Sequence, residues 1–151
     1  MEVPTISLLL TAALVGGGLG AVFAPDDGDA SYEAHSRTFS CSVTHVYDGD
    51  GPIYCAEGAK VRLTAIAARE LNEGCRPGHP CPDASGAHAR DGLRALADGQ
   101  RLNCEATGES YGRITAWCHR SDGVELNCAM VRKGLALHWQ RYDPDGRLCT
   151  T

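Results

Sequence analysis

The chain has 151 residues, of which 43% are hydrophobic and 22% are charged. This balance excludes a wholly disordered protein, and the length suits one domain with a hydrophobic core better than two. The formal net charge is −5, but five acids lie before residue 35, and the other 14 acids are matched by 14 Lys and Arg residues. The neutral remainder lacks the broad basic surface of a tight, nonspecific nucleic-acid binder, although it leaves room for a local anion site.

An uncharged apolar run covers residues 6–24 and is about as long as a membrane-spanning helix. We interpret residues 1–24 as a signal peptide, because Val22-Phe23-Ala24 suits a cleavage site. Two features favour a retained membrane anchor instead: no Lys or Arg precedes the run, and Pro25 would follow the cut. Both alternatives put the rest of the chain on the exported side, as a periplasmic or secreted protein that is free or tethered through residues 6–24.

An acidic, polar stretch without periodicity follows over residues 25–38, which indicates a linker. The folded domain is then predicted over residues 39–151. Its first part holds three strands joined by short Gly-containing turns, and the third strand alternates polar and apolar residues. The predicted strands cover residues 41–47, 52–55 and 60–66, which together form a meander.

The second half of the domain alternates helices and strands. A loop rich in Gly and Pro covers residues 71–82, a helix is predicted to end at Gly99, and a loop around Gly108 separates two further strands. Trp139 and Tyr142 are expected to pack in the tail. These helices cover residues 83–98 and 126–133, and the strands cover residues 100–106 and 113–119. The order βββαββα predicts an α+β fold in which helices pack on a small closed five-stranded barrel.

All eight Cys residues lie after the apolar run, and their even number indicates up to four disulfides in an oxidising compartment. Two pairs flank neighbouring strands symmetrically, a third closes a short loop, and the fourth is what remains. A zinc site using Cys75, His79 and Cys81, with His88 nearby, is disfavoured because the spacing matches no common structural zinc pattern. The expected pairs are Cys41–Cys55, Cys104–Cys118, Cys75–Cys81 and Cys128–Cys149.

Several charged residues follow strands or turns in a way that suits phosphate chemistry. Asp48 and Asp50 flank a glycine in a tight turn, where two carboxylates can converge on Ca²⁺ or simply be solvated. Arg62 lies on a predicted strand and Glu70 follows its end, which fits a phosphate clamp beside a general base or an ordinary surface salt bridge.

Short motifs occur in a fixed order along the domain: Val46-Tyr-Asp-Gly-Asp50, Val61-Arg-Leu63, Ile66 to Glu70, Tyr111-Gly-Arg113, Leu126-Asn127 and Val131-Arg-Lys-Gly-Leu-Ala136. The order of these motifs resembles the staphylococcal nuclease (thermonuclease) family over roughly residues 41–142. The resemblance implies a five-stranded OB-fold barrel with packed helices, in an exported, cysteine-rich, bacterial-type member of that family.

The resemblance also implies a role for each candidate residue. Arg62 and Arg113 would grip a phosphodiester and offset the charge that builds on its oxygens, while Glu70 would act as the general base. Asp50 would bind Ca²⁺, with support from Asp48 through water.

The calcium site departs from the family pattern, which usually reads Ile-Asp-x-Pro-Glu before the base. Ala67 stands where the second metal-binding Asp is expected, and Ala68 offers only its backbone carbonyl. Loss of one of two carboxylates weakens calcium binding greatly. Arg69 replaces the proline, so the turn before Glu70 is expected to be less constrained, with Arg69 as a fixed positive charge near the phosphate.

Two functions follow from the sequence. The first is an exported nuclease-like phosphodiesterase, calcium-dependent through a weakened site, that hydrolyses DNA or RNA as a monomer. The second is a catalytically inactive nuclease-like module that binds nucleic acid, a nucleotide or a protein, as Ala67 and the neutral domain suggest. A purely structural, disulfide-stabilised envelope domain ranks behind both.

Overall fold

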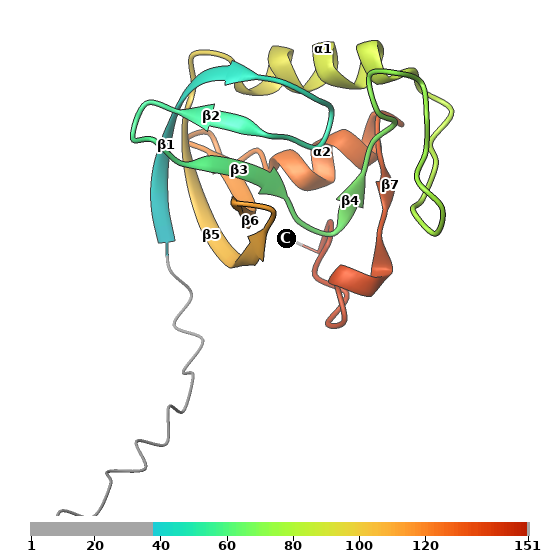
Figure 1. Ribbon diagram of the computed structural model, residues 1–151. Helices are drawn as coiled ribbons and strands as arrows, with labels where there is room; N and C mark the ends of the chain where they lie inside the picture. The colour runs from blue at the N-terminus through green and yellow to red at the C-terminus, as the bar shows by residue number, and fades with distance from the viewer. Residues whose placement is uncertain (1–37, 151) are drawn as a thin grey trace, which may run out of the picture. The chain divides into compact units, whose positions relative to one another are not determined.

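The computed structural model describes residues 38–150 (Figure 1). The signal peptide or anchor predicted for residues 1–24, and all but the last residue of the predicted linker, lie outside the described residues. The elements in chain order are β1 (Thr38–Val46), β2 (Ile53–Cys55), β3 (Lys60–Leu63), β4 (Ile66–Ala67), α1 (Gly86–Ala97), β5 (Arg101–Ser110), β6 (Arg113–Arg120), α2 (Leu126–Arg132), β7 (Leu137–His138) and the 3-10 turn η1 (Gln140–Tyr142).

Five of the strands form a closed barrel in the order β1-β2-β3-β6-β5. Strands β1, β2 and β3 pair antiparallel as a meander, β5 pairs antiparallel with both β1 and β6, and only β3 and β6 run parallel. Helix α1 lies along one end of the barrel in Figure 1 and contacts β1 and α2, which in turn packs on β6. The predicted α+β fold with a closed five-stranded barrel is therefore confirmed.

Alternation along the strands fills the barrel and leaves polar groups outside. In β3, Val61 and Leu63 are fully buried, whereas Arg62 between them points out toward a cavity. Helix α1 contributes Leu93 to the same core, and α2 contributes Met130. Burying each such side chain stabilises the fold by about 1.5–3 kcal/mol, so the core fixes which face of β3 carries Arg62.

Asn127 ties α2 to the barrel through hydrogen bonds in a fully buried position. Its Nδ2 donates to the Thr64 and Ala116 carbonyl oxygens at 2.8 and 3.1 Å, and its Oδ1 accepts from the Cys118 amide at 3.2 Å. Buried backbone groups need such partners. The Leu126-Asn127 motif of the sequence therefore has a structural role: it holds the end of β3 against β6.

The structure corrects the predicted elements in three places. The strand predicted over residues 60–66 stops at Leu63, because Ala65 adopts a left-handed backbone conformation with φ 59°. Ile66 and Ala67 instead form β4, which pairs with the unpredicted β7 outside the barrel. The loop predicted at Gly108 is a register shift inside a longer β5, and α1 begins at Gly86 with Ser85 as its N-cap.

All four predicted disulfides are confirmed. Two of them lie in the barrel core, and one of these joins directly opposed residues of β5 and β6. The pairs are Cys41–Cys55, Cys75–Cys81, Cys104–Cys118 and Cys128–Cys149, and the described part of the chain holds no free cysteine. Four disulfides in one small domain indicate an oxidising, extracellular-type compartment. Within residues 38–150, no helix combines the length and apolar character that a membrane crossing needs.

Candidate functional site

One cavity of about 1020 Å³ opens beside the barrel, and the predicted charged residues meet there. Strand β3 contributes Arg62, the start of β6 contributes Arg113, and Glu70 comes from the segment after β4. Asp48 and Asp50 reach it from the turn between β1 and β2. These five residues, which are distant in sequence, therefore share one cavity.

The turn that carries the two aspartates is packed tightly against α1 and β4. A Cβ atom on Gly49 would lie 2.5 Å from the Ala89 Cβ and 2.8 Å from the Ala68 Cβ, closer than real Cβ atoms approach. The sequence suggested that this glycine serves a sharp turn. The structure shows that it also serves close approach: Gly49, Ala68 and Ala89 are small so that the acidic turn can sit against the helix.

Asp50 and Arg62 form an ion pair at the base of the cavity. Arg62 Nη2 lies 2.8 Å from Asp50 Oδ2, and the side chains of Arg62 and Asp50 are only 14% and 15% exposed, respectively. The same oxygen accepts a hydrogen bond from the Ala68 amide at 3.3 Å. Burial raises the pKa of Asp50, and the charge of Glu70 adds to this, while Arg62, the Ala68 amide and Arg113 act to lower it.

Asp48 lies deeper and interacts with Glu70. It is buried, and its Oδ1 accepts a hydrogen bond from the Gly49 amide at 2.7 Å. The pKa of Asp48 is raised to about 6, chiefly by burial and also by the charges of Asp50 and Glu70, against the lowering effect of the Gly49 amide. A side-chain hydrogen bond with Glu70 raises the pKa of Asp48 further.

Glu70 is held by the loop that follows it, over residues 71–82. Its amide donates to the Gly74 carbonyl at 3.1 Å, and its carbonyl accepts from the Glu73 amide at 2.9 Å. A Cβ on Gly86 would overlap the Glu70 carbonyl oxygen, so glycine lets the first turn of α1 press directly against this backbone. Both oxygens of the Glu73 carboxylate share the single N–H of Gly86, at 3.2 Å each, which fixes the loop to the helix.

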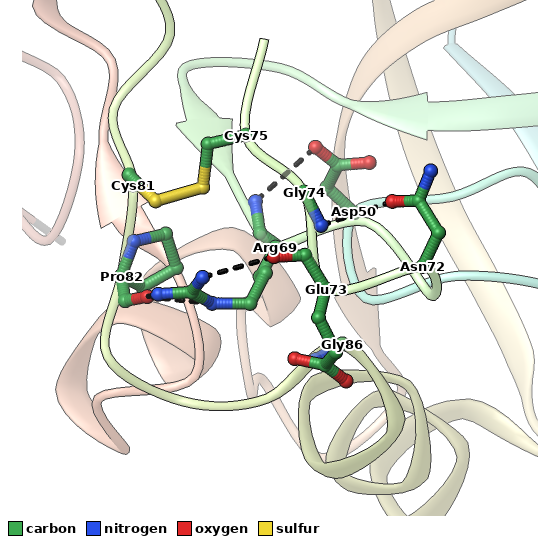
Figure 2. The surroundings of a disulfide bond; sticks show 10 residues. Asp50, Arg69, Asn72, Glu73, Gly74, Cys75, Cys81, Pro82 and Gly86 are labelled. Atoms are coloured by element: carbon green, nitrogen blue, oxygen red, sulfur yellow. Dashed lines mark hydrogen bonds between the residues drawn. A yellow bond between two sulfur atoms is a disulfide. The ribbon is translucent and has the colours of Figure 1, made fainter.

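Arg69 cross-links the same loop (Figure 2). Its Nε and Nη2 donate to the Pro82 carbonyl at 3.2 and 2.8 Å, and Nη1 donates to the Glu73 carbonyl at 3.0 Å. The Cys75–Cys81 disulfide closes the loop beside it. Two expectations are thereby corrected: Arg69 does not line the cavity, and the turn before Glu70, expected to be less constrained without a proline, is constrained by three hydrogen bonds.

The remaining cations differ in how far they are already engaged. Arg113 Nε donates to the Ser110 carbonyl at 3.1 Å, and among the described residues its two terminal nitrogens have no hydrogen-bond partner. Arg76, from the disulfide-closed loop, approaches Glu70 Oε1 at 3.4 Å. Both groups are largely exposed, with side chains 64% and 41% exposed, so this pair is weak. Arg113 therefore has the guanidinium most available to an incoming anion.

An aromatic cluster closes one side of the cavity. The His79 and Trp139 rings lie with centroids 4.2 Å apart, and Trp139 meets Tyr142 edge-on at 4.7 Å. The Arg62 guanidinium lies 5.8 Å from the Trp139 ring centre. Trp139 and Tyr142 were expected only to pack in the tail, but they line the cavity. The missed signal is their spacing of three, which η1 turns to one side.

The donor set does not fit calcium. Ca²⁺ takes six to eight oxygen ligands at about 2.3–2.6 Å, usually several from carboxylates. Here one oxygen of Asp50 is held by Arg62 and the Ala68 amide, one oxygen of Asp48 is held by Gly49, and Ala67 is aliphatic and 2% exposed. Within residues 38–150, no group of three or more His, Cys, Asp or Glu side chains is arranged to hold a metal ion.

Comparison of the chain with known protein families finds no match, and comparison with curated proteins finds none either. The resemblance to staphylococcal nucleases therefore remains a prediction from motif order, and so do the roles that it assigns to the cavity residues.

Proposed function

We propose that the protein is a phosphodiesterase of the staphylococcal nuclease type, with an OB-type barrel, that hydrolyses DNA or RNA as an exported monomer. The observation that carries the proposal is the convergence of Arg62, Arg113 and Glu70 on one cavity, next to the Asp48–Asp50 turn. Two cations and a carboxylate around one hollow match what phosphodiester hydrolysis needs: charge stabilisation at the phosphorus oxygens and a base for water.

The two arginines take different parts. Arg113 offers two terminal nitrogens in a fork that matches two phosphate oxygens. Arg62 is oriented by Asp50 at 2.8 Å and by the Leu63 carbonyl at 3.3 Å, so it is held in place before the phosphate arrives. Such preorganised charge stabilises the negative charge that grows on the phosphorus oxygens as water attacks.

Glu70 supplies the base. Its carboxylate is 41% exposed and so reaches water in the cavity. It takes a proton from the attacking water while the new P–O bond forms and the bond to the leaving oxygen breaks. Asp48 lies next to Glu70, and at pH values up to about 6, where Asp48 holds a proton, it donates that proton in a hydrogen bond that orients Glu70. None of these reaction steps uses a metal ion, and calcium dependence remains a separate prediction.

A second candidate is the inactive binding module. It is favoured by the Asp50–Arg62 ion pair, which engages both a metal ligand and a phosphate clamp of the nuclease pattern. Ala67 adds to this, because it removes a carboxylate from the same place. Such a protein would bind a phosphate-bearing ligand through Arg113 and release it unchanged.

Cleavage of a labelled single-stranded DNA by the purified protein, with its four disulfides intact, separates the two candidates. A general base contributes about 10²–10⁴-fold to rate, so Glu70→Gln should lower cleavage by that factor while substrate binding persists. Glu109→Gln, on the same cavity, is the matched control and should cleave like the wild type. Binding without cleavage, both in EDTA and in millimolar calcium, would establish the binding module instead.

A further inference from the structure

A second hollow of about 510 Å³ adjoins the cavity and carries only positive charge. Its charged lining residues are Lys60, Arg76 and Arg113, and no carboxylate lines it. We call it the basic groove. It is completed by Pro52, Tyr54 and Tyr111, and four of its six residues also line the cavity. The groove is thus a continuation of the cavity along β2, β3 and the turn before β6.

Two of the three cations of the groove, Lys60 and Arg113, lie against aromatic rings, whereas Arg76 makes a weak ion pair with Glu70 at 3.4 Å. Lys60 Nζ lies 5.7 Å from the Tyr54 ring centre, and the Arg113 guanidinium lies 6.0 Å from that of Tyr111. Within residues 38–150, neither cation forms an ion pair with a carboxylate. Tyr111 is 90% exposed with φ 51°, so its ring projects into solvent at the groove edge.

The opposite side of the cavity is acidic. Glu105, Asp143 and Asp145 line it there, and the nearby Arg147 is already paired with Glu105 at 2.7 Å. Asp143 is buried, and its carboxylate accepts hydrogen bonds from the Arg147 and Leu148 amides and pairs with His138 Nε2 at 3.0 Å, so the exposed negative charge on this side comes mainly from Asp145. An anionic chain leaving the cavity is therefore repelled on this acidic side and attracted on the side of Lys60 and Arg76.

We propose that the basic groove is a binding subsite for the continuing strand of a single-stranded nucleic acid, so that the protein acts on polynucleotides rather than on small phosphate diesters. The inference rests on the proposed function, since it extends the same cavity. Lys60 and Arg76 contact the phosphates next to the one held by Arg113. Tyr54 and Tyr111 offer faces on which bases stack with little regard to sequence.

The test is binding of fluorescent oligothymidylates of two and eight nucleotides to the full chain carrying Glu70→Gln, which prevents cleavage. Affinity is measured by anisotropy across a salt series. A longer strand binds more tightly simply because it can bind in more positions. The test therefore compares the salt dependence of the affinity and not the affinity itself. Three phosphate contacts predict a slope of log affinity against log salt of about −2 for the eight-nucleotide strand, and clearly less for the short one.

Lys60→Ala should lower affinity for the long strand about threefold to tenfold and reduce the slope by about 0.7. Lys133→Ala is the matched control, since it removes the only other lysine of the chain, at an exposed position after α2. Equal salt slopes for the two strands, equal effects of the two lysine variants, or an octaglutamate peptide that competes as well as the long strand would each overturn the proposal.

These outcomes are distinct from failure of the proposed function. If the wild-type protein hydrolyses the dinucleotide, but the salt slope of binding is the same for both strand lengths, then the subsite proposal is refuted and the proposed hydrolysis stands. If the wild-type protein cleaves neither strand, but binding depends on strand length and is weakened by Lys60→Ala, then the subsite proposal stands and the proposed hydrolysis is refuted. Absence of binding to both strands removes the groove whatever the cleavage assay shows.

Discussion

The cavity has two walls that are built in different ways. The barrel wall carries Asp50, Arg62 and Arg113 on strand ends and tight turns whose opposite faces are buried in the core. The loop wall carries Glu70 and Arg76, which stand on segments with almost no core beneath them. The loop wall is fixed instead by a disulfide, by Arg69 and by the capped start of α1.

The two walls of the cavity therefore differ in stability: the barrel wall is as stable as the whole fold, and the loop wall depends on local contacts. A side chain on the barrel wall moves only if the barrel opens, because its strand shares the hydrophobic core. A side chain on the loop wall can move when a few hydrogen bonds break, at a cost well below the global free energy of unfolding. In the proposed mechanism, the two arginines therefore lie on the rigid wall, and Glu70 lies on the wall that can adjust.

The largest effect is expected from Asn127→Ala, which attacks the barrel wall. The change leaves the Thr64 carbonyl and the Cys118 amide without their buried partner, while the Ala116 carbonyl keeps only its hydrogen bond from the Thr64 amide. Each unsatisfied group costs about 1–3 kcal/mol, so the free energy of unfolding should fall by about 3–5 kcal/mol. Chemical denaturation followed by tryptophan fluorescence measures this loss.

Asn103→Ala, at an exposed position in β5, is the control for the same chemical change and should shift stability by less than about 0.5 kcal/mol. Both walls should lose structure together in Asn127→Ala, because the barrel supports them both. A loss no larger than that of Asn103→Ala would mean that α2 is not what holds β3 against β6.

A smaller effect is expected from Asp48→Asn, at the point where the walls meet. Because the pKa of Asp48 is raised from 3.8 to about 6, the folded protein keeps a proton that the unfolded chain has released between these values. The free energy of unfolding therefore falls as pH rises through this interval. Asn cannot ionise, so the variant should be more stable than the wild type by roughly 2 kcal/mol at pH 7, and by little at pH 4.

Urea denaturation in EDTA at several pH values gives the two profiles, and their difference isolates Asp48 from the pKa shift of Asp50. Asp83→Asn, at an exposed position before α1, should reproduce the wild-type profile. A difference that is flat with pH, or a variant less stable than the wild type at pH 7, would show that the acidic turn is not strained by its buried charge.

The two walls also differ in how far the sequence could predict them. Alternation in the Lys60–Leu63 strand, turn residues and cysteine spacing gave the barrel, both helices and all four disulfides, because these depend on local pattern and on the core. The convergence of Arg62 and Arg113 follows from the parallel pairing of β3 and β6. The elements and disulfides are encoded by local period and spacing, which a single sequence displays, whereas the parallel pairing that brings the two arginines together is visible only in the structure.

The loop wall could not be read in the same way. Nothing in the local sequence around Arg69 says that its guanidinium turns from the cavity to the Pro82 carbonyl, since that contact spans 13 residues of irregular chain. The role of Gly49 is hidden for the same reason: it depends on Ala89, in a helix far along the chain. The position of Trp139 depends on β7, whose two residues carry too little pattern to predict.

The smallest change in global stability is expected from Arg69→Met, which keeps the length of the side chain and removes its three hydrogen bonds. This variant tests directly whether the loop wall is less stable than the barrel wall. The free energy of unfolding should fall by only about 1 kcal/mol, because no core residue is lost. Hydrogen exchange should quicken about tenfold or more at the amides of Glu70 and Glu73, while amides of β3 and β6 keep their protection.

Arg94→Met is the control: it removes one hydrogen bond to the Val46 carbonyl, on the barrel side, and should leave the loop unchanged. If Arg69→Met instead quickened exchange uniformly, the loop would share the stability of the barrel, and Glu70 would stand on a support as rigid as that of Arg62.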